Sequence, residues 1–196
     1  MSLIEWLCQK WALEKELEHP TYIVGLGSGV LKEETGELTT ASKNVVDKCF
    51  SVYHIHQQAA GIILVGGMPW KTPPFTDVGL MHKRLLKLRE SINQFDLPLE
   101  RITTLKGNNT HEQIHAVHLF LQDYPRATAL VVCPRLQSRR LRAILKKHNV
   151  LDRTGIRTVN DGCEPHRPVE KFRWSLTRYL MREMLACVHH KLHGWI

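Results

Sequence analysis

The residues of this chain that could do chemistry are glycines and polar side chains that follow short apolar runs. Five such groups occur along the sequence: Gly25–Gly29, Gly66–Gly67, Gly107–Thr110, Pro134–Arg140 and Asn160–Gly162. Backbone N–H groups at glycine-rich turns and the guanidinium groups of arginine are donors that bind anions in proteins. The pattern therefore favours an anionic small-molecule ligand.

Eight residues are candidates for the site. The candidate donors to the ligand are Gly27, Ser28, Gly67, Asn109 and Thr110. Arg135 and Arg140 would neutralise the anion. Glu112 would act as a general base, or would orient a hydroxyl or a metal-bound water. Each has a structural alternative, because glycines form turns, single arginines are commonly solvated, and Asn109 with Glu112 three residues later matches a helix capping box.

The apolar pattern around these groups alternates between strand and helix periods. Strands are predicted over residues 21–26, 61–65, 102–105, 127–133 and 156–159. Helices are predicted over residues 2–18, 40–58, 77–95, 109–122, 136–148 and 168–192. Continuous apolar strands that alternate with helices indicate a parallel sheet covered on both faces.

We therefore expect a single α/β domain over residues 1–196, with a three-layer, Rossmann-like, open and mainly parallel sheet. Its core would span about residues 20–162, and the terminal helices 2–18 and 168–192 would pack on it. The carboxyl ends of parallel strands share one edge of the sheet, and ligands bind in the crevice there. The five polar groups follow the five strands, so we expect them to meet at that edge.

An ordinary NAD site is excluded at the first group. Gly25–Gly29 lacks the dinucleotide spacing, and about a dozen residues separate it from the next predicted helix. The dinucleotide fingerprint opens its helix at once. With NAD excluded at this position, the sequence assigns no cofactor, and the cofactor stays unknown.

His111-Glu112-Gln113-Ile114-His115 matches the HExxH spacing of zinc peptidases. Two imidazoles four residues apart share one face of a helix and could hold zinc, with the glutamate as base. However, Glu112 is well explained as a cap, no glycine-plus-histidine continuation follows, and the chain has 12 histidines. We therefore assign no metal and keep a zinc peptidase as the weakest hypothesis.

The net charge of +8 is concentrated in the second half of the chain. Residues 1–98 carry 10 basic and 11 acidic side chains, whereas residues 99–196 carry 17 basic and 8 acidic ones. A basic half can attract nucleic acid or another acidic partner, which is our second hypothesis. We favour a simpler interpretation, in which lysine and arginine coat solvent-facing helices, because no nucleic-acid-binding signature accompanies the charge.

No apolar run reaches about 18 residues, so the sequence predicts no membrane-spanning helix. The five cysteines are odd in number and widely spaced, without a CxxC pair. That spacing argues against a disulfide framework and a structural zinc site, and we expect reduced thiols and a cytoplasmic location. The oligomeric state is unknown: Trp6, Trp11, Trp174 and Trp195 fit either packing within the chain or a dimer face.

In their order and spacing, the polar groups resemble the motifs of the SanA/YdcF/ElyC-like family, a bacterial domain of largely unknown function. The family has a strand ending in a glycine-rich turn, a Ser/Thr-led helix, a Gly-Gly strand end, an Asn-Thr-x-Glu-Asn helix start and a His-x-x-Arg-Ala segment. The corresponding segments here are Gly25–Gly29, Thr39–Ser42, Gly66–Gly67, Asn109–Gln113 and Gln137–Arg140. The resemblance spans about residues 20–150 and implies a Rossmann-like fold with a polar ligand cleft.

Three positions depart from the family's pattern. Gln113 replaces the second asparagine, Gln137 replaces the histidine, and Asp77 is the nearest candidate for an acidic residue expected after Gly-Gly. Glutamine could substitute for a histidine that only donates a hydrogen bond, but not for one that carries a proton. Our favoured hypothesis is a small-molecule-binding α/β domain of this type for a nucleotide-like or phosphorylated ligand, with hydrolase, transferase and non-catalytic roles all open.

Overall fold

The computed structural model describes residues 3–28, 30–32, 36–67, 76–92, 97–161, 176–194 and 196. A five-stranded sheet lies at its centre, with the spatial order β5-β4-β1-β6-β7. The strands are β1 (Tyr22–Leu26), β4 (Gly61–Gly66), β5 (Ile102–Lys106), β6 (Ala129–Pro134) and β7 (Thr154–Val159). All neighbouring strands in this sheet are parallel, which confirms the Rossmann-like open α/β fold.

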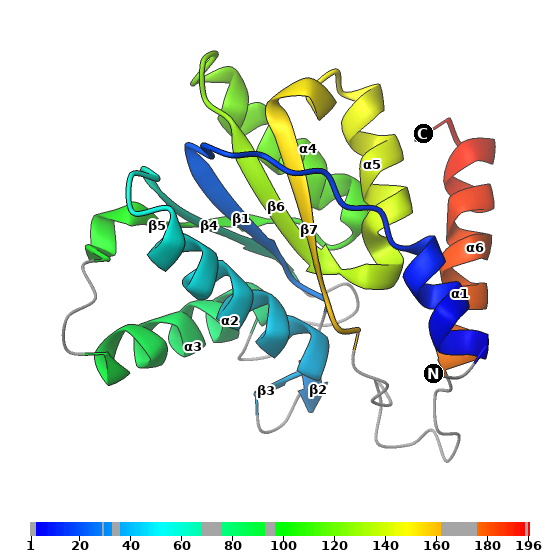
Figure 1. The fold of residues 1–196 in the computed structure, drawn as a ribbon, viewed down its shortest axis with the longest axis horizontal. Helices are drawn as coiled ribbons and strands as arrows, with labels where there is room; N and C mark the ends of the chain where they lie inside the picture. Colours follow the sequence, from blue (N-terminus) through cyan, green and yellow to red (C-terminus); the bar gives the residue numbers. More distant parts are fainter. Residues whose placement is uncertain are drawn as a thin grey trace.

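Helices cover both faces of the sheet, as Figure 1 shows. Helices α2 (Thr40–Ile55) and α3 (Asp77–Ser91) cover one face, and α4 (Thr110–Gln122) and α5 (Ser138–Lys147) cover the other. Neighbouring strand residues point to opposite faces, so Ile23 of β1 packs with α2 and α3 while Val24 packs with α4 and α5. Burial on both faces explains why the strands are continuously apolar.

The strand order reverses between β1 and β6, which are neighbours in the sheet but distant in sequence. From β1 the chain passes outward to β4 and β5, and it then returns to form β6 and β7 on the other side. The register pairs Gly25 with Val132, so the residues that follow β1 and β6 emerge side by side. We call the side of the sheet where the strands end the carboxyl edge; it is where ligands bind in open α/β folds.

The two terminal helices pack against each other beside α5 (Figure 1). Helices α1 (Leu3–Trp11) and α6 (Leu176–Leu192) meet the short 3-10 helix η2 (Arg135–Gln137). Cys8, Leu136, Tyr179 and Leu180 form a small buried cluster there. Arg139 strengthens this junction, because it donates to the carbonyl oxygens of Lys10 and Trp11 and its guanidinium lies 4.9 Å from the centre of the Trp11 ring.

The helix predicted over residues 2–18 is too long, because α1 ends at Trp11. Beyond it the backbone pairs with the outer edge of β7: Lys15 N–H donates to Ile156 O at 3.0 Å, and Ile156 N–H donates to Lys15 O at 2.7 Å. Leu13 N–H donates to the hydroxyl of Ser138. Hydrogen bonds to the rest of the fold thus outweigh the local helical pattern.

Other boundaries differ by a few residues from the prediction. Helix α2 ends at Ile55 and α3 at Ser91, and α6 is described from Leu176 onward, so the predicted residues 168–175 lie outside the described part. A two-stranded hairpin, β2 (Val30–Lys32) and β3 (Glu37–Leu38), lies between β1 and α2 and was not predicted. In the described part of the chain, no helix is long and apolar enough to cross a membrane.

The close approach of β4 to the segment that enters β5 can be tested by a substitution at Gly61. A Cβ atom at this position would lie 2.2 Å from the carbonyl oxygen of Arg101. We expect Gly61→Ala to lower the free energy of unfolding by about 1–3 kcal/mol, measured by urea denaturation. Gly79→Ala, on the exposed side of α3 where the new Cβ meets only the Thr76 side chain at 3.0 Å, should change it by less than about 1 kcal/mol. Equal effects of the two substitutions would contradict this account.

Candidate functional site

Ser28, just after β1, is tied to the start of α2. Its N–H donates to the hydroxyl of Ser42 at 3.0 Å, and its own hydroxyl lies 3.4 Å from that of Thr39. Thr39 is the N-cap of α2 and accepts the N–H of Ser42. Thr39 and Ser42 are buried, whereas Ser28 is partly exposed. The result is a network of three hydroxyl groups whose outermost member is a predicted ligand-binding residue.

The carboxylate of Asp77 is buried against the glycines that end β1 and β4. Asp77 is the first residue of α3 and is only 2% exposed. A Cβ atom on Gly27 would lie 2.6 Å from Asp77 Oδ2, and one on Gly66 would lie 2.4 Å from Oδ1. A side chain at either position would displace the carboxylate, so glycine is required there by close approach. Asp77, which the sequence offered as the nearest candidate for the acidic residue expected after Gly-Gly, thus lies at the carboxyl edge.

Gln113 joins α4 to the end of β1. Its Nε2 donates to the carbonyl oxygen of Gly27 at 3.2 Å, although the side chain is only 5% exposed. A carbonyl oxygen can only accept, so this contact fixes which end of the amide faces Gly27. The other end, Oε1, is buried and has no hydrogen-bond partner among the described residues. An unsatisfied buried oxygen of this kind is unusual in folded proteins.

Asn109 and Glu112 form a capping box at the start of α4. Asn109 Oδ1 accepts the N–H of Glu112 at 2.9 Å, and Glu112 Oε2 accepts the N–H of Asn108 at 2.9 Å. Glu112 Oε1 accepts a hydrogen bond from the Asn109 side chain at 2.5 Å. Both carboxylate oxygens are therefore used by the cap, and the role of Glu112 as a general base stays a prediction. Thr110 is the first residue of α4, and Gly67 lies against Asn108, where a Cβ would be 2.4 Å from its Oδ1.

Arg135 and Arg140, predicted to neutralise an anion, are both paired with buried carboxylates. Arg135 Nε lies 3.1 Å from Asp161 Oδ2, whose other oxygen accepts the N–H of Leu136. Arg140 Nη2 lies 3.1 Å from Glu183 Oε2 and 3.2 Å from Oε1. Burial raises the pKa of both acids above their ordinary values, although the facing arginines oppose this shift. These pairs join β6 to the end of β7 and α5 to α6, so anion binding by the arginines stays a prediction.

Gln137 lies between these two pairs in sequence and is 8% exposed. Its Nε2 donates to the Tyr179 hydroxyl of α6 at 3.3 Å. Its Oε1 is buried and, like that of Gln113, has no partner in the described part of the chain. This is the position at which the resemblance leads us to expect a histidine.

Two polar clusters therefore lie at the carboxyl edge. The β1 cluster consists of Ser28, Thr39, Ser42, Asp77 and Gln113, with Gly67, Asn109 and Thr110 next to it. The β6 cluster consists of Arg135, Gln137, Arg140, Asp161 and Glu183. Because β1 and β6 are neighbouring strands, the segments that carry Ser28 and Arg135 leave the sheet next to each other. Gly29 and Gly162, from the first and last polar groups, lie outside the described residues.

Glu183 was missed by the sequence analysis. It is the single acidic residue of α6 and is 1% exposed. The signal that could have found it is the buried stripe of this helix, in which Tyr179, Glu183 and His190 lie on one side at helical spacing. An acid on the buried side of a helix requires a cationic partner, and Arg140 is that partner.

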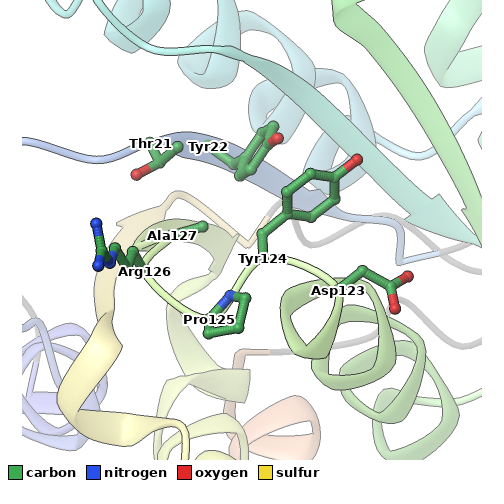
Figure 2. A pocket seen from close by; sticks show the side chains of 7 residues that line it. All are labelled: Thr21, Tyr22, Asp123, Tyr124, Pro125, Arg126 and Ala127. Carbon is green, nitrogen blue, oxygen red and sulfur yellow. The ribbon is translucent and has the colours of Figure 1, made fainter.

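A pocket at the opposite edge of the sheet does not share these features. Figure 2 shows its lining, which is Thr21, Tyr22, Asp123, Tyr124, Pro125, Arg126 and Ala127. The rings of Tyr22 and Tyr124 lie 5.9 Å apart, and the Asp123 carboxylate points away from Tyr22 (Figure 2). These residues lie at the start of β1 and before β6, and none of the predicted site residues is among them.

The histidines of the HExxH segment gather with others between α4 and α5. His148, at the end of α5, lies 5.6 Å from His111, 5.6 Å from His115 and 5.0 Å from His118, measured between ring centres. Glu112 is turned away into the capping box. Of the residues that the structure describes, no three His, Cys, Asp or Glu side chains could hold a metal ion. The described side chains therefore do not form the zinc site that HExxH would require.

Comparison of the chain with protein-family models, curated proteins and solved structures found no match. Its function is therefore inferred from the residues of the carboxyl edge.

Glu183 provides a test of the β6 cluster. Because Arg140 is only 13% exposed at its side chain, Glu183→Ala would leave a mostly buried charge without its carboxylate. We expect the free energy of unfolding to fall by about 3–5 kcal/mol. Thr177→Ala, at an exposed position of α6, should have little effect. A Glu183→Ala protein as stable as the Thr177 control in urea denaturation would show that the pair does not hold α6.

The histidine cluster predicts a loss of stability in mild acid. Burial, followed by neighbouring positive groups, lowers the pKa of His111, His118 and His148, and it lowers the pKa of His190 to about 4. The folded state thus binds fewer protons than the unfolded state, whose histidines titrate near about 6.5. Stability from these groups is present above that pH and is lost as the pH falls below it.

Urea unfolding at several pH values between neutrality and mild acid measures this loss. His148→Gln should reduce the pH dependence, because it removes the imidazole that contacts His111, His115 and His118. His82→Gln, in α3 on the other face of the sheet, should leave it unchanged. Identical pH dependence in the wild type and His148→Gln would refute the role of the cluster.

Proposed function

We propose that this chain is a small-molecule-binding α/β domain of the SanA/YdcF/ElyC-like type, whose ligand binds across the β1 and β6 clusters. The supporting observation is a pair of buried glutamine side chains, Gln113 and Gln137, at the same edge of the sheet. Each has an amide oxygen without a partner among the described residues. Buried polar atoms of this kind are normally satisfied by protein, water or a bound molecule.

The chemistry of these groups suggests a ligand that both donates hydrogen bonds and carries phosphate. An amide oxygen accepts, so the ligand would present hydroxyl or N–H groups to Gln113 and Gln137. Helices α2, α4 and α5 all begin at the carboxyl edge, where their first N–H groups and dipoles favour a phosphate. A nucleotide or a sugar phosphate combines both properties.

The charged side chains at the carboxyl edge indicate which groups would bind the phosphate of the ligand. Arg135 and Arg140 are each paired with a carboxylate, Asp161 and Glu183, so helix N-termini would attract the phosphate together with the remaining N–H donors of these two guanidinium groups. If the domain catalyses a hydrolase or transferase reaction, Asp77 is a second candidate for the general base, because it is the carboxylate within the β1 cluster. Both carboxylate oxygens of Glu112, the first candidate, already accept hydrogen bonds in the cap of α4.

A nucleic-acid-binding role is less well supported. Three of the basic residues that suggested it are engaged inside the fold: Arg135 and Arg140 in ion pairs, and Arg139 on the carbonyl oxygens of Lys10 and Trp11. Groups held in this way contribute less to a phosphate-binding surface than solvated ones do.

Calorimetric titration with a panel of nucleoside diphosphates and sugar phosphates tests the proposal. We expect at least one compound to bind the wild type, and Gln113→Leu or Gln137→Leu to raise its Kd by about tenfold or more, because a buried hydrogen bond is lost. Tyr124→Ala, in the pocket at the opposite edge, should leave the Kd unchanged. Wild-type affinity in both glutamine variants would overturn the assignment, and a loss of binding in Tyr124→Ala alone would move the site to the other edge.

A further inference from the structure

Helix α6 exposes a continuous apolar stripe. Its members are Met181 (57% exposed), Met184 (48%), Leu185 (67%), Val188 (56%) and Leu192 (81%). Their spacing places them on one side of the helix, whereas Tyr179, Leu180 and Glu183 face the protein. The stripe is therefore not the side that holds α6 to the domain.

Helix α1, which lies beside α6 (Figure 1), adds three more exposed apolar side chains. They are Leu3 (75%), Trp6 (43%) and Leu7 (40%). Of the 13 large apolar side chains that are exposed in the described part of the chain, these two helices carry eight. Single exposed apolar residues are ordinary, but such a concentration marks a surface that contacts a protein, a membrane or a ligand.

Positive charge borders this stripe. Arg178 and Arg182 lie on one side of it and Lys191 on the other, all three exposed. Glu183 is the single acid of α6, and it is buried against Arg140. On α1, the ammonium group of Lys10 lies 5.9 Å from the centre of the Trp6 ring, and the one acid of that helix is Glu5.

We propose that α1 and α6 form a docking surface for an anionic lipid membrane. The apolar stripe would enter the boundary between headgroups and acyl chains, with Arg178, Arg182 and Lys191 at the level of the phosphates. An apolar face bordered by cations, with tryptophan nearby, is the arrangement of helices that lie in the plane of a membrane interface. This inference is independent of the ligand site at the carboxyl edge.

The charge argues against a second copy of the chain as the occupant. Two α6 helices that met through their stripes would gather Arg178, Arg182 and Lys191 of both copies along one interface, with Glu183 as the single acid of each helix and already paired with Arg140. Like charges on the flanks of paired helices disfavour association. An anionic surface of lipid headgroups instead complements them.

Co-sedimentation with vesicles tests this proposal on the full chain. The wild type should sediment with vesicles of equimolar phosphatidylcholine and phosphatidylglycerol and much less with phosphatidylcholine alone. The double variant Leu185→Glu with Val188→Glu should bind about tenfold more weakly, because it places charge in the stripe. A variant with Arg182→Gln and Lys191→Gln should lose the preference for phosphatidylglycerol while its circular dichroism is unchanged.

Leu119→Glu is the matched control, since Leu119 is a similarly exposed apolar residue (48%) on α4, away from this surface. It should bind vesicles like the wild type. The proposal is overturned if the wild type sediments with neither vesicle, or if the double variant binds as the wild type does. It is also overturned if light scattering shows a wild-type dimer that the double variant converts to a monomer, because the stripe then joins two copies.

Discussion

Two buried ion pairs, Arg135 with Asp161 and Arg140 with Glu183, determine how the second half of the chain is assembled. The first ties the end of β6 to the end of β7, and the second ties α5 to α6. Because α6 is fixed by Glu183 on one side, its opposite side faces outward with its apolar stripe. The same two contacts thus shape the carboxyl edge and the proposed membrane surface. Both arginines that the sequence assigns to an anionic ligand therefore already face a carboxylate within the fold.

The β1 cluster follows a different physical rule, which is close approach rather than charge pairing. Gly27 and Gly66 leave room for the Asp77 carboxylate, and the Gly27 carbonyl oxygen receives the amide of Gln113. The ends of β1 and β4, the first turn of α3 and the first turn of α4 meet at these contacts. Segments far apart in sequence thus meet in one buried polar centre, and the proposed ligand site is built around it.

The fold could be predicted from the sequence because its signals are local and repeated. The apolar runs at residues 61–65 and 127–133 are buried on both faces, and helices of clear periodicity separate them. The limits of α1 could not be predicted, since the pairing of Lys15 with Ile156 joins residues that are distant along the chain. The partners of Arg135 and Arg140 were missed for the same reason. A side chain's type shows what it is able to bind, whereas its partner depends on the finished packing. Asn109 with Glu112 is the exception, because a capping box is formed within three residues.

The antiparallel bridge between Lys15 and Ile156 also has a bearing on self-association. The outermost strand of a sheet presents unpaired backbone groups that can template the addition of a foreign strand. Here the segment after α1 lies along β7 and uses the Ile156 N–H and C=O groups itself. The Lys15 ammonium group, which donates to the carbonyl oxygen of Leu151, fastens that segment further. The segment after α1 thus covers these backbone groups of β7, and we expect it to disfavour the pairing of β7 with a strand of another molecule.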